Sequence, residues 1–473
     1  MTPHSSFRKT KIICTIGPAT SSFDNLKALH QAGMNIARLN MSHGDHDSHR
    51  EVIKRIKTIN KTAVHPIAIL LDTQGPEIRT GDVAENVMLN VGEEIEITIY
   101  EENIENKSAI MVNYKDMVND LNPGDRVTVD NGIINLEVIE KGEFKLKCRV
   151  IDGGLLKSRR HINLPGIRVN LPSITAKDRH DIEFAIKEDL DFIALSFVRT
   201  ADDVEECKGI IDSSNHHAQV IAKIEDSLGS DNYKAIIAAS HGVMVARGDL
   251  GIEVPLEDLP IIQRRIVKEA AEQGKRVIIA THLLESMIEN PIPTRAEVTD
   301  VANAVYEEAD GIMLSGETTI GKYPVKAVSY LDSISRRIER SGGLRWAEKR
   351  IASGQKAKLA RAAVELADNM RAQGMVVITR RGVTADNVSS FHPRFSPIFA
   401  FTNMSTVRRK LVLNRGCFAF RIDFSNDPER TIRNAFSLLK KRGLVHEGAT
   451  IVVVSDVLAG DFRVDAIQVR TIT

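Results

Sequence analysis

Short apolar segments recur along the first two thirds of the chain, and each is followed by polar or glycine-containing residues. Eight of them are predicted strands: residues 11–16, 35–40, 67–72, 192–197, 220–225, 242–246, 276–281 and 311–315. Segments with helical periodicity lie between most of them, at 24–32, 49–60, 201–211, 256–273 and 299–308. Strands that alternate with helices indicate an α/β protein with a parallel sheet. A count of eight favours a closed (β/α)8 barrel (a TIM barrel) over an open doubly wound sheet.

The pattern changes between the third and fourth predicted strands. Alternating apolar and polar residues occur at 94–99 and 126–129, with turn signals at Asn122-Pro123-Gly124-Asp125 and Asp130-Asn131-Gly132. We therefore expect a small β-barrel domain, inserted as a lid, at residues 76–172. The catalytic barrel should then comprise residues 1–75 and 173–345. Strands and helices alternate again from about Ala357, which predicts a C-terminal α/β domain at 346–473.

Charge and composition exclude some classes of function. Lys plus Arg and Asp plus Glu both number 63, so the formal net charge is zero, which does not favour nucleic acid or a membrane surface as a partner. No apolar run approaches the roughly 18 residues that span a bilayer. Residues 1–9 contain no apolar signal core, and the four cysteines, Cys14, Cys148, Cys207 and Cys417, have no metal-like spacing. We expect free thiols and a cytoplasmic protein.

Charged and polar residues follow the ends of several predicted strands. Lys223, Glu225 and Asp249 follow two consecutive strands. Because the carboxyl ends of barrel strands form one face, these groups should converge at one rim into a metal-and-cation site. Simpler roles exist for single residues, since Arg38 could pair with Asp72 and Asp249 could cap the next helix. The other residues at this predicted rim are Asn40, Ser42, His43, Thr73, Arg79, Ala246, Arg247, Gly248, Thr281 and Glu317.

Several long motifs, in order along nearly the whole chain, resemble those of the pyruvate kinase family. They are KIICTIGPAT (11–20), GMNIARLNMSHG (33–44), LDTQGPEIRTG (71–81), AKIE (222–225), MVARGDLG (244–251), PTRAEVTDVANAV (293–305) and IMLSGE (312–317). The resemblance implies phosphoryl transfer from phosphoenolpyruvate to ADP in glycolysis, giving pyruvate and ATP. It also implies a homotetramer under allosteric control.

The resemblance also assigns roles to residues. Glu225 and Asp249 would hold Mg²⁺ or Mn²⁺, while Lys223 and Arg38 would stabilise the phosphoryl group during transfer. Backbone N–H groups at Ala246, Arg247, Gly248 and Asp249 would bind the substrate carboxylate, and Thr281 would lie beside the enolate. Asn40, Ser42, Asp72 and Thr73 would bind K⁺, and Asn40, His43 and Arg79 would face the nucleotide.

Some positions depart from the family pattern. Gln74 replaces a frequent lysine, whereas Glu77 matches the potassium-requiring members. Arg159-Arg160 replaces a lysine pair, His161 replaces a glycine, and Leu228 replaces an acidic residue.

In the C-terminal domain, many family members have a phosphate-binding loop rich in Ser and Thr. This chain has the sequence TRRGVT at that place, residues 379–384. Arg380 and Arg381, with Thr384, could bind a phosphorylated effector, or the two arginines could be a solvated surface pair.

Two rival functions account for part of the same pattern. A metal-dependent lyase acting on a pyruvate-like substrate would explain Lys223, Glu225 and Asp249, but not the inserted lid. An inactive regulator would be expected to have lost Lys223, Arg38 or a metal carboxylate, and all of these are present.

Overall fold

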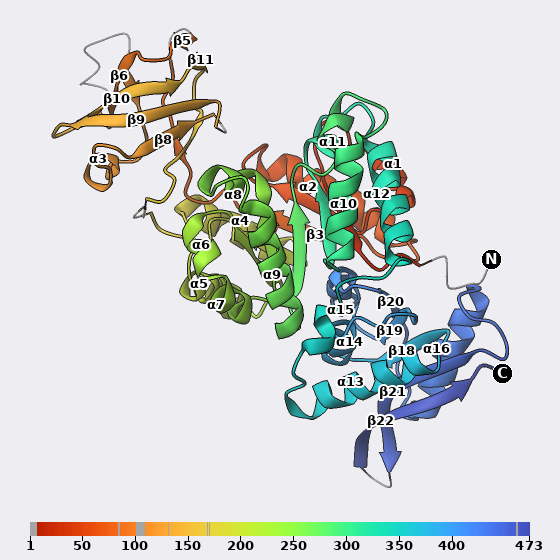
Figure 1. The fold of residues 1–473 in the computed structure, drawn as a ribbon. Coiled ribbons are helices and arrows are strands. Elements are labelled where there is room, and N and C mark those ends of the chain that lie inside the picture. Colours follow the sequence, from red (N-terminus) through yellow and green to blue (C-terminus); the bar gives the residue numbers. More distant parts are fainter. Residues whose placement is uncertain are drawn as a thin grey trace.

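The computed structural model describes residues 7–473 except 84–85, 101–108, 131, 168, 170 and 460–461. Asn131 of one predicted turn and residues 1–6 of the segment inspected for a signal core therefore lie outside the described residues. The described chain forms a central barrel, a sheet domain at one end and a C-terminal domain at the other, as Figure 1 shows.

The barrel confirms the predicted eight-stranded parallel architecture. Its hydrogen-bonded order is β1-β17-β16-β15-β14-β13-β3-β2, and each neighbouring pair is parallel. The strands are β1 (Lys11–Thr15), β2 (Ile36–Asn40), β3 (Ala68–Asp72), β13 (Phe192–Leu195), β14 (Gln219–Ile224), β15 (Gly242–Ala246), β16 (Arg276–Ala280) and β17 (Gly311–Leu314).

Helices connect these strands on the outside of the barrel. They are α1 (Phe23–Ala32), α2 (His46–Asn60), α4 (Ala176–Lys187), α5 (Ala201–Ser213), α6 (Ser227–Asp231), α7 (Tyr233–Ala239), α8 (Arg247–Glu253), α9 (Leu259–Gln273), α10 (Arg295–Tyr306), α11 (Gly316–Thr319) and α12 (Pro324–Glu339). The helix predicted at 256–273 begins later, at Leu259. Its second residue is Pro260, which fits a first helical turn because proline needs no backbone hydrogen bond there.

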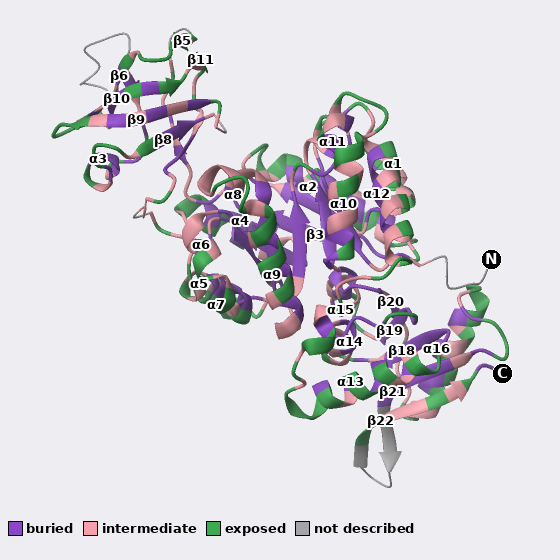
Figure 2. Ribbon diagram, viewed as in Figure 1, coloured by how far each residue is buried: buried purple, intermediate pink, exposed green. Residues whose placement is uncertain are grey.

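Two apolar layers explain why the barrel strands read as continuous hydrophobic runs. Inward-facing side chains such as Ile13, Leu70 and Met244 fill the barrel interior. The alternate side chains, such as Ile12 and Val243, pack against the helices in a second core. Both faces of each strand are therefore covered, as in other parallel sheets, and the strands are coloured as buried in Figure 2.

The inserted domain is a curled antiparallel sheet with one parallel edge pair. Its seven-stranded order is β4-β12-β8-β9-β10-β6-β7, with a separate pair β5-β11. An isolated bridge between Thr80 and Val112 joins the ends of the two edge strands, so the sheet curls back on itself as a small barrel. The elements are β4 (Ile78–Arg79), β5 (Val87–Leu89), β6 (Glu94–Thr98), β7 (Ala109–Met111), α3 (Met117–Asp120), β8 (Arg126–Val129), β9 (Ile134–Lys141), β10 (Lys145–Asp152), β11 (Gly154–Leu156) and β12 (His161–Asn163).

The C-terminal domain is a five-stranded sheet in the order β20-β19-β18-β21-β22, parallel except for the edge strand β22. Its elements are α13 (Gly354–Asn369), β18 (Gly374–Ile378), α14 (Val383–Ser389), β19 (Ile398–Thr402), α15 (Ser405–Lys410), β20 (Cys417–Arg421), α16 (Pro428–Lys441), β21 (Thr450–Ala459) and β22 (Phe462–Thr471). Three short 3-10 helices, η3 (Glu285–Ile288), η4 (Trp346–Lys349) and η5 (Leu411–Leu413), complete the elements named here.

The C-terminal domain packs against the amino ends of the barrel strands. Arg276, at the start of β16, pairs with Asp386 at 2.5 Å, and Arg409 of α15 pairs with Asp191, just before β13, at 2.7 Å. The opposite, carboxyl end of the barrel faces the inserted domain (Figure 1). None of the helices in the described ranges has the length and apolar character that a membrane span requires. All four cysteines are buried free thiols.

Candidate active site

Lys223 lies at the centre of a buried charge cluster at the carboxyl end of the barrel. Its Nζ is 3.0 Å from Oδ1 of Asp72, 2.8 Å from Oε1 of Glu225 and 2.7 Å from Oγ of Ser196. Asp72 and Glu225 are almost fully buried, and Lys223 is 8% exposed. The ends of β3, β13 and β14 therefore bring together four residues that the sequence separates by up to 153 positions.

Arg38 extends the cluster to β2. Its Nε is 2.5 Å from Oδ2 of Asp72, and its Nη1 donates to Oγ1 of Thr15 at 2.9 Å. The strand-end ion pair considered from the sequence is thus present. It is also part of the candidate site, because Asp72 holds Arg38 with one oxygen and Lys223 with the other.

Electrostatics keep Lys223 charged. Burial alone would lower the pKa of Lys223, but Asp72 and Glu225 together outweigh burial and the net shift is upward. Burial likewise opposes ionisation of Asp72, and the neighbouring Arg38 and Lys223 reverse this and lower its pKa. The site therefore presents fixed positive charge where an anionic substrate group can be bound.

Glu225 behaves differently from Asp72. Burial raises the pKa of Glu225 to about 7; Lys223 opposes this rise and the nearby charge of Asp249 adds to it. Oε2 of Glu225 accepts a hydrogen bond from the backbone N–H of Phe197 at 2.7 Å. The neighbouring carboxylates of Glu225 and Asp249 suit a divalent cation. Lys223 alone does not balance their two negative charges, and a bound divalent cation would supply the missing positive charge. The residues present fit the Mg²⁺ or Mn²⁺ that the sequence predicts.

Ser196 and Phe197 contact Lys223 and Glu225, and neither was among the site residues predicted from the sequence. Oγ of Ser196 accepts a hydrogen bond from Nζ of Lys223 and donates one to the carbonyl of Thr73 at 2.6 Å. Phe197 has a positive φ of 51°, an uncommon conformation for a bulky residue, and this directs its N–H at Glu225. Their position in the sequence could have identified them, because both residues lie at the end of the predicted strand 192–197, at the same rim of the barrel as Lys223.

The loop after β15 carries the predicted carboxylate-binding backbone. Arg247, Gly248 and Asp249 begin α8, which follows Ala246 directly. The N–H of Gly248 donates to Oγ1 of Thr281 at 2.7 Å, and that hydroxyl donates to the carbonyl of Ala280. Thr281 itself has a φ of 66°. Gly248 and Thr281 are thus brought together, as predicted for two groups that bind one substrate.

The side chain of Arg247 is used structurally. It is buried, and its guanidinium pairs with Asp300 at 2.7 Å and donates to the carbonyl of Thr281 at 2.6 Å. The sequence analysis did not identify Asp300. This arginine holds the left-handed turn at Thr281, whose hydroxyl accepts the hydrogen bond from the N–H of Gly248.

The predicted potassium set lies at the ends of β2 and β3. The N–H of Ser42 donates to Oδ1 of Asn40 at 3.2 Å, and the carbonyl of Thr73 accepts from Ser196. Both carboxylate oxygens of Asp72 already face Arg38 and Lys223. All four candidate ligands offer oxygen atoms, the ligand type that hard cations prefer.

The residues predicted to face the nucleotide lie at the barrel rim and the base of the lid. Arg79 pairs with Glu77 at 2.7 Å, and Glu77 also accepts from Nε2 of Gln74. His43 accepts through its carbonyl from His49. The charges of Arg79 and Glu77 are thus already matched at the point where the chain enters the lid.

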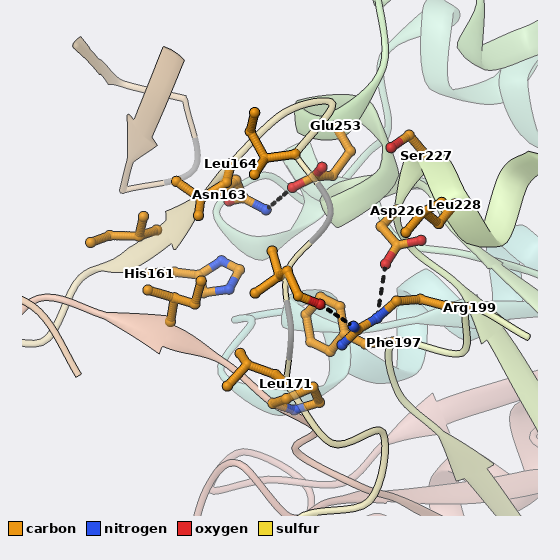
Figure 3. Close-up of a pocket in the computed structure, with 15 residues that line it drawn as sticks. His161, Asn163, Leu164, Leu171, Phe197, Arg199, Asp226, Ser227, Leu228 and Glu253 are labelled. Atoms are coloured by element: carbon orange, nitrogen blue, oxygen red, sulfur yellow. Dashed lines mark hydrogen bonds and ion pairs between the residues drawn. The ribbon is translucent and has the colours of Figure 1, made fainter. Parts of the chain in front are cut away.

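A pocket lies between lid and barrel (Figure 3), and Phe197, which lines it, donates its backbone N–H to Glu225. His161 and Asn163 line it from β12, and Arg199, Asp226 and Glu253 line it from the barrel. Nδ2 of Asn163 donates to Glu253 at 2.9 Å, which links the two domains. Burial lowers the pKa of His161, against the opposing charges of Asp249 and Glu77. This pocket is lined by none of Lys223, Glu225 and Arg38, so it adjoins the candidate site rather than forming it.

The predicted effector residues lie elsewhere. Arg380 and Arg381 are exposed between β18 and α14, and Thr384 lies in the first turn of α14. Neither arginine forms an ion pair with any described residue. In the described part of the chain, these three residues form no hydrogen bond or ion pair with the Lys223 cluster.

Fold and site together define a class. A (β/α)8 barrel with a lid, whose mouth holds a permanently charged lysine between carboxylates, is an enzyme for anionic substrates.

Comparisons with known proteins then give the family. Residues 7–328 match the family model "Pyruvate kinase, barrel domain", and residues 357–469 match "Pyruvate kinase, alpha/beta domain". The chain is 44% identical to plastidial pyruvate kinase 2 of Arabidopsis thaliana, over 94% of this chain and 78% of the relative. It is 43% identical to pyruvate kinase isozyme G, chloroplastic, of Nicotiana tabacum, over 94% and 80%. A crystal structure of a pyruvate kinase from Cryptosporidium parvum is similar with a TM-score of 0.94 at 35% identity, covering 100% of this chain and 98% of that one.

The chain belongs to the pyruvate kinase family. It is a phosphotransferase of glycolysis whose substrates are phosphoenolpyruvate and ADP. No observation here favours the lyase alternative.

One prediction is wrong. The cytoplasmic location is contradicted by the relatives from Arabidopsis thaliana and Nicotiana tabacum, which are named as plastidial and chloroplastic proteins. The reason for the error is physical: free thiols indicate a reducing compartment, and they do not distinguish one reducing compartment from another.

Proposed function

We propose that the cluster around Lys223 catalyses the transfer of the phosphoryl group from phosphoenolpyruvate to ADP. The observation that carries this proposal is the position of Lys223, held cationic by Asp72 and Glu225 at the carboxyl end of the barrel. Phosphoryl transfer depends mainly on positioning and on neutralising charge, so a rigid buried cation is the group that the reaction needs.

Arg38 and Lys223 act on the phosphoryl group from two sides. Both are anchored by Asp72, at 2.5 Å and 3.0 Å, which fixes the separation of the two charges. Lys223 also neutralises the enolate oxygen as the phosphoryl group leaves. Because the anchors are in place before substrate arrives, little reorganisation is needed during the reaction.

Glu225 and Asp249 hold a divalent Mg²⁺ or Mn²⁺, which supplies charge neutralisation to substrate oxygens when it is bound. The backbone N–H groups of Gly248 and Asp249, at the start of α8, bind the substrate carboxylate. The Gly248 N–H exchanges its bond to Oγ1 of Thr281 for this ligand. The Thr281 hydroxyl turns from the carbonyl of Ala280 toward the enolate methylene, gives it a proton and is reprotonated by water.

Potassium and nucleotide complete the proposed site. Asn40, Ser42, Asp72 and Thr73 bind K⁺ beside the phosphoryl group. His43 and Arg79, with Asn40, contact the nucleotide as the lid domain approaches the barrel.

We further propose that the enzyme is a homotetramer whose activity responds to a phosphorylated effector. Arg380, Arg381 and Thr384 are one place for the effector phosphate, which is supported by the two exposed and unpaired arginines among the described residues. Arginine recognises phosphate well because its planar fork donates two parallel hydrogen bonds.

The proposal is tested by measuring pyruvate formation with and without ADP, in the presence of Mg²⁺ and K⁺. Pyruvate and ATP should form in equal amounts and only when ADP is present. Pyruvate released from a phosphate-free precursor without ADP would identify a lyase instead.

A further inference from the structure

A second candidate site lies at the other end of the barrel from Lys223. A cavity of about 360 Å³ opens between the barrel and the C-terminal domain. On the barrel side it is lined by the end of α2, with Lys57 and Lys61, and by residues at the start of β3. On the other side it is lined by Arg408 of α15 and Arg421 at the end of β20. None of these residues belongs to the catalytic cluster.

The lining of this cavity carries excess positive charge. Five of its residues are basic and two, Asp189 and Asp191, are acidic. Both acidic residues are already paired with Arg409, each at 2.7 Å. Lys57 reaches Glu188 at 3.6 Å. Among the described residues the other three basic groups, Lys61, Arg408 and Arg421, form no ion pair.

Arg408 is a preorganised part of this lining. Its Nη2 donates to the backbone carbonyls of Ala63 and Val64, at 3.1 Å and 2.8 Å, so the side chain spans the contact between the two domains. Burial lowers the pKa of Arg408, and Arg442 and Arg421 lower it further. The neighbouring cations therefore repel one another, and a bound anion would relieve that repulsion.

We propose that this cavity binds a phosphorylated small molecule, with its phosphate held by Lys61, Arg408 and Arg421. A phosphate monoester fits because it carries nearly two negative charges and because arginine and lysine are the usual phosphate ligands. The volume is at the small end of the range for ligand pockets, which suits one sugar phosphate or nucleoside monophosphate. The site is distinct from Arg380 and Arg381, and it does not depend on the catalytic roles proposed above.

Binding to the full-length protein is measured by calorimetry at constant ionic strength and without divalent metal. The probes are ribose 5-phosphate, glucose 6-phosphate and AMP, with ribose, glucose and adenosine as their uncharged counterparts. The test variant is K61A/R421A, and the matched control is K27A/R430A, which likewise removes one lysine of the barrel and one arginine of the C-terminal domain. Both pairs are exposed and lack ion pairs in the described structure, so neither double variant should disturb folding.

At least one phosphorylated probe should bind wild type and K27A/R430A with equal affinity. It should bind K61A/R421A at least tenfold more weakly, and its uncharged counterpart should not bind. The site is refuted if no phosphorylated probe binds wild type, or if K61A/R421A keeps wild-type affinity. It is also refuted if K27A/R430A loses as much affinity as K61A/R421A. If K61A/R421A has a lowered melting temperature, the same comparison is made with K61Q/R421Q.

Discussion

At the scale of single residues, the site depends on how one lysine is surrounded. Lys223, Glu225 and Asp72 were identified from the sequence because charge at the end of an apolar strand is costly unless it is used. Their pairing was not predictable in detail. Ser196 resembles any serine at the end of a strand, and only the folded barrel shows its hydroxyl 2.7 Å from Nζ of Lys223.

Glu225→Gln should weaken binding of the divalent metal without preventing folding. The substitution keeps the shape of the side chain and removes one of the two carboxylates. Metal affinity, measured by titration with Mn²⁺, should fall at least tenfold, because a neutral amide is a weaker ligand for a divalent ion. Equal Mn²⁺ affinity in wild type and variant would place the metal site elsewhere.

Ser196→Ala should lower kcat by about tenfold, because Lys223 loses one charge-assisted hydrogen bond and keeps two carboxylate partners. The control is Ser335→Ala, which removes a buried hydroxyl that has no hydrogen-bond partner in the described structure. The two variants should differ in kcat for pyruvate formation. If both lowered kcat equally, the role assigned to Ser196 would be wrong.

At the scale of elements, the alternation of strands and helices was predictable, and the contacts between them were not. Each barrel strand is buried on both faces, so its apolar run is a strong signal. The lid strands are short and paired across long sequence separations, as in β4 with β12, and no local pattern encodes that register. The left-handed turn at Thr281 likewise depends on Arg247 and Asp300, which lie on other elements.

A hydrogen bond between strand β14 and the side chain of His241 should make the free energy of unfolding depend on pH. Nδ1 of His241 accepts a hydrogen bond from the N–H of Val220, which requires an unprotonated nitrogen. Burial, with Arg276 and Lys208 nearby, lowers the pKa of His241 to about 3. Because this pKa lies below the unfolded value of about 6.5, the contribution of His241 is complete above pH 6.5. It is lost as the pH falls toward 3.

His241→Asn removes the ionisation and offers an amide oxygen as the hydrogen-bond acceptor. Its melting temperature should therefore fall less steeply than that of wild type as the pH is lowered from 7 to 5. The exposed His180→Gln is the control and should follow wild type. An unchanged slope in His241→Asn would show that His241 does not contribute to the pH dependence.

At the scale of the whole molecule, the barrel separates two candidate sites. The lid faces the carboxyl ends of the strands and the Lys223 cluster, and the C-terminal domain packs on the amino ends. Domain order was predictable from interruptions in the strand pattern. The cavity at the domain contact was not, because Lys61 and Arg421 come from different domains and lie 360 positions apart.

Activity of the assembled enzyme should require potassium. A bound K⁺ supplies positive charge near the phosphoryl group, and at position 77 this chain has a glutamate rather than a lysine that could replace it. Activity should be low in buffer without K⁺, and Glu77→Lys should restore part of it. The exposed Glu257→Lys is the control and should remain dependent on K⁺. Full wild-type activity without K⁺ would contradict this prediction.

The most direct test of the central claim is the turnover of Lys223→Met with phosphoenolpyruvate and ADP at saturating Mg²⁺ and K⁺. The substitution keeps most of the side-chain volume and removes the charge that Asp72 and Glu225 hold in place. Lys322→Met, which removes an exposed lysine paired with Glu289, is the control. Loss of a cation aimed at developing negative charge should lower kcat by about a hundredfold or more, while Lys322→Met should match wild type. Near-normal kcat in Lys223→Met would contradict the account.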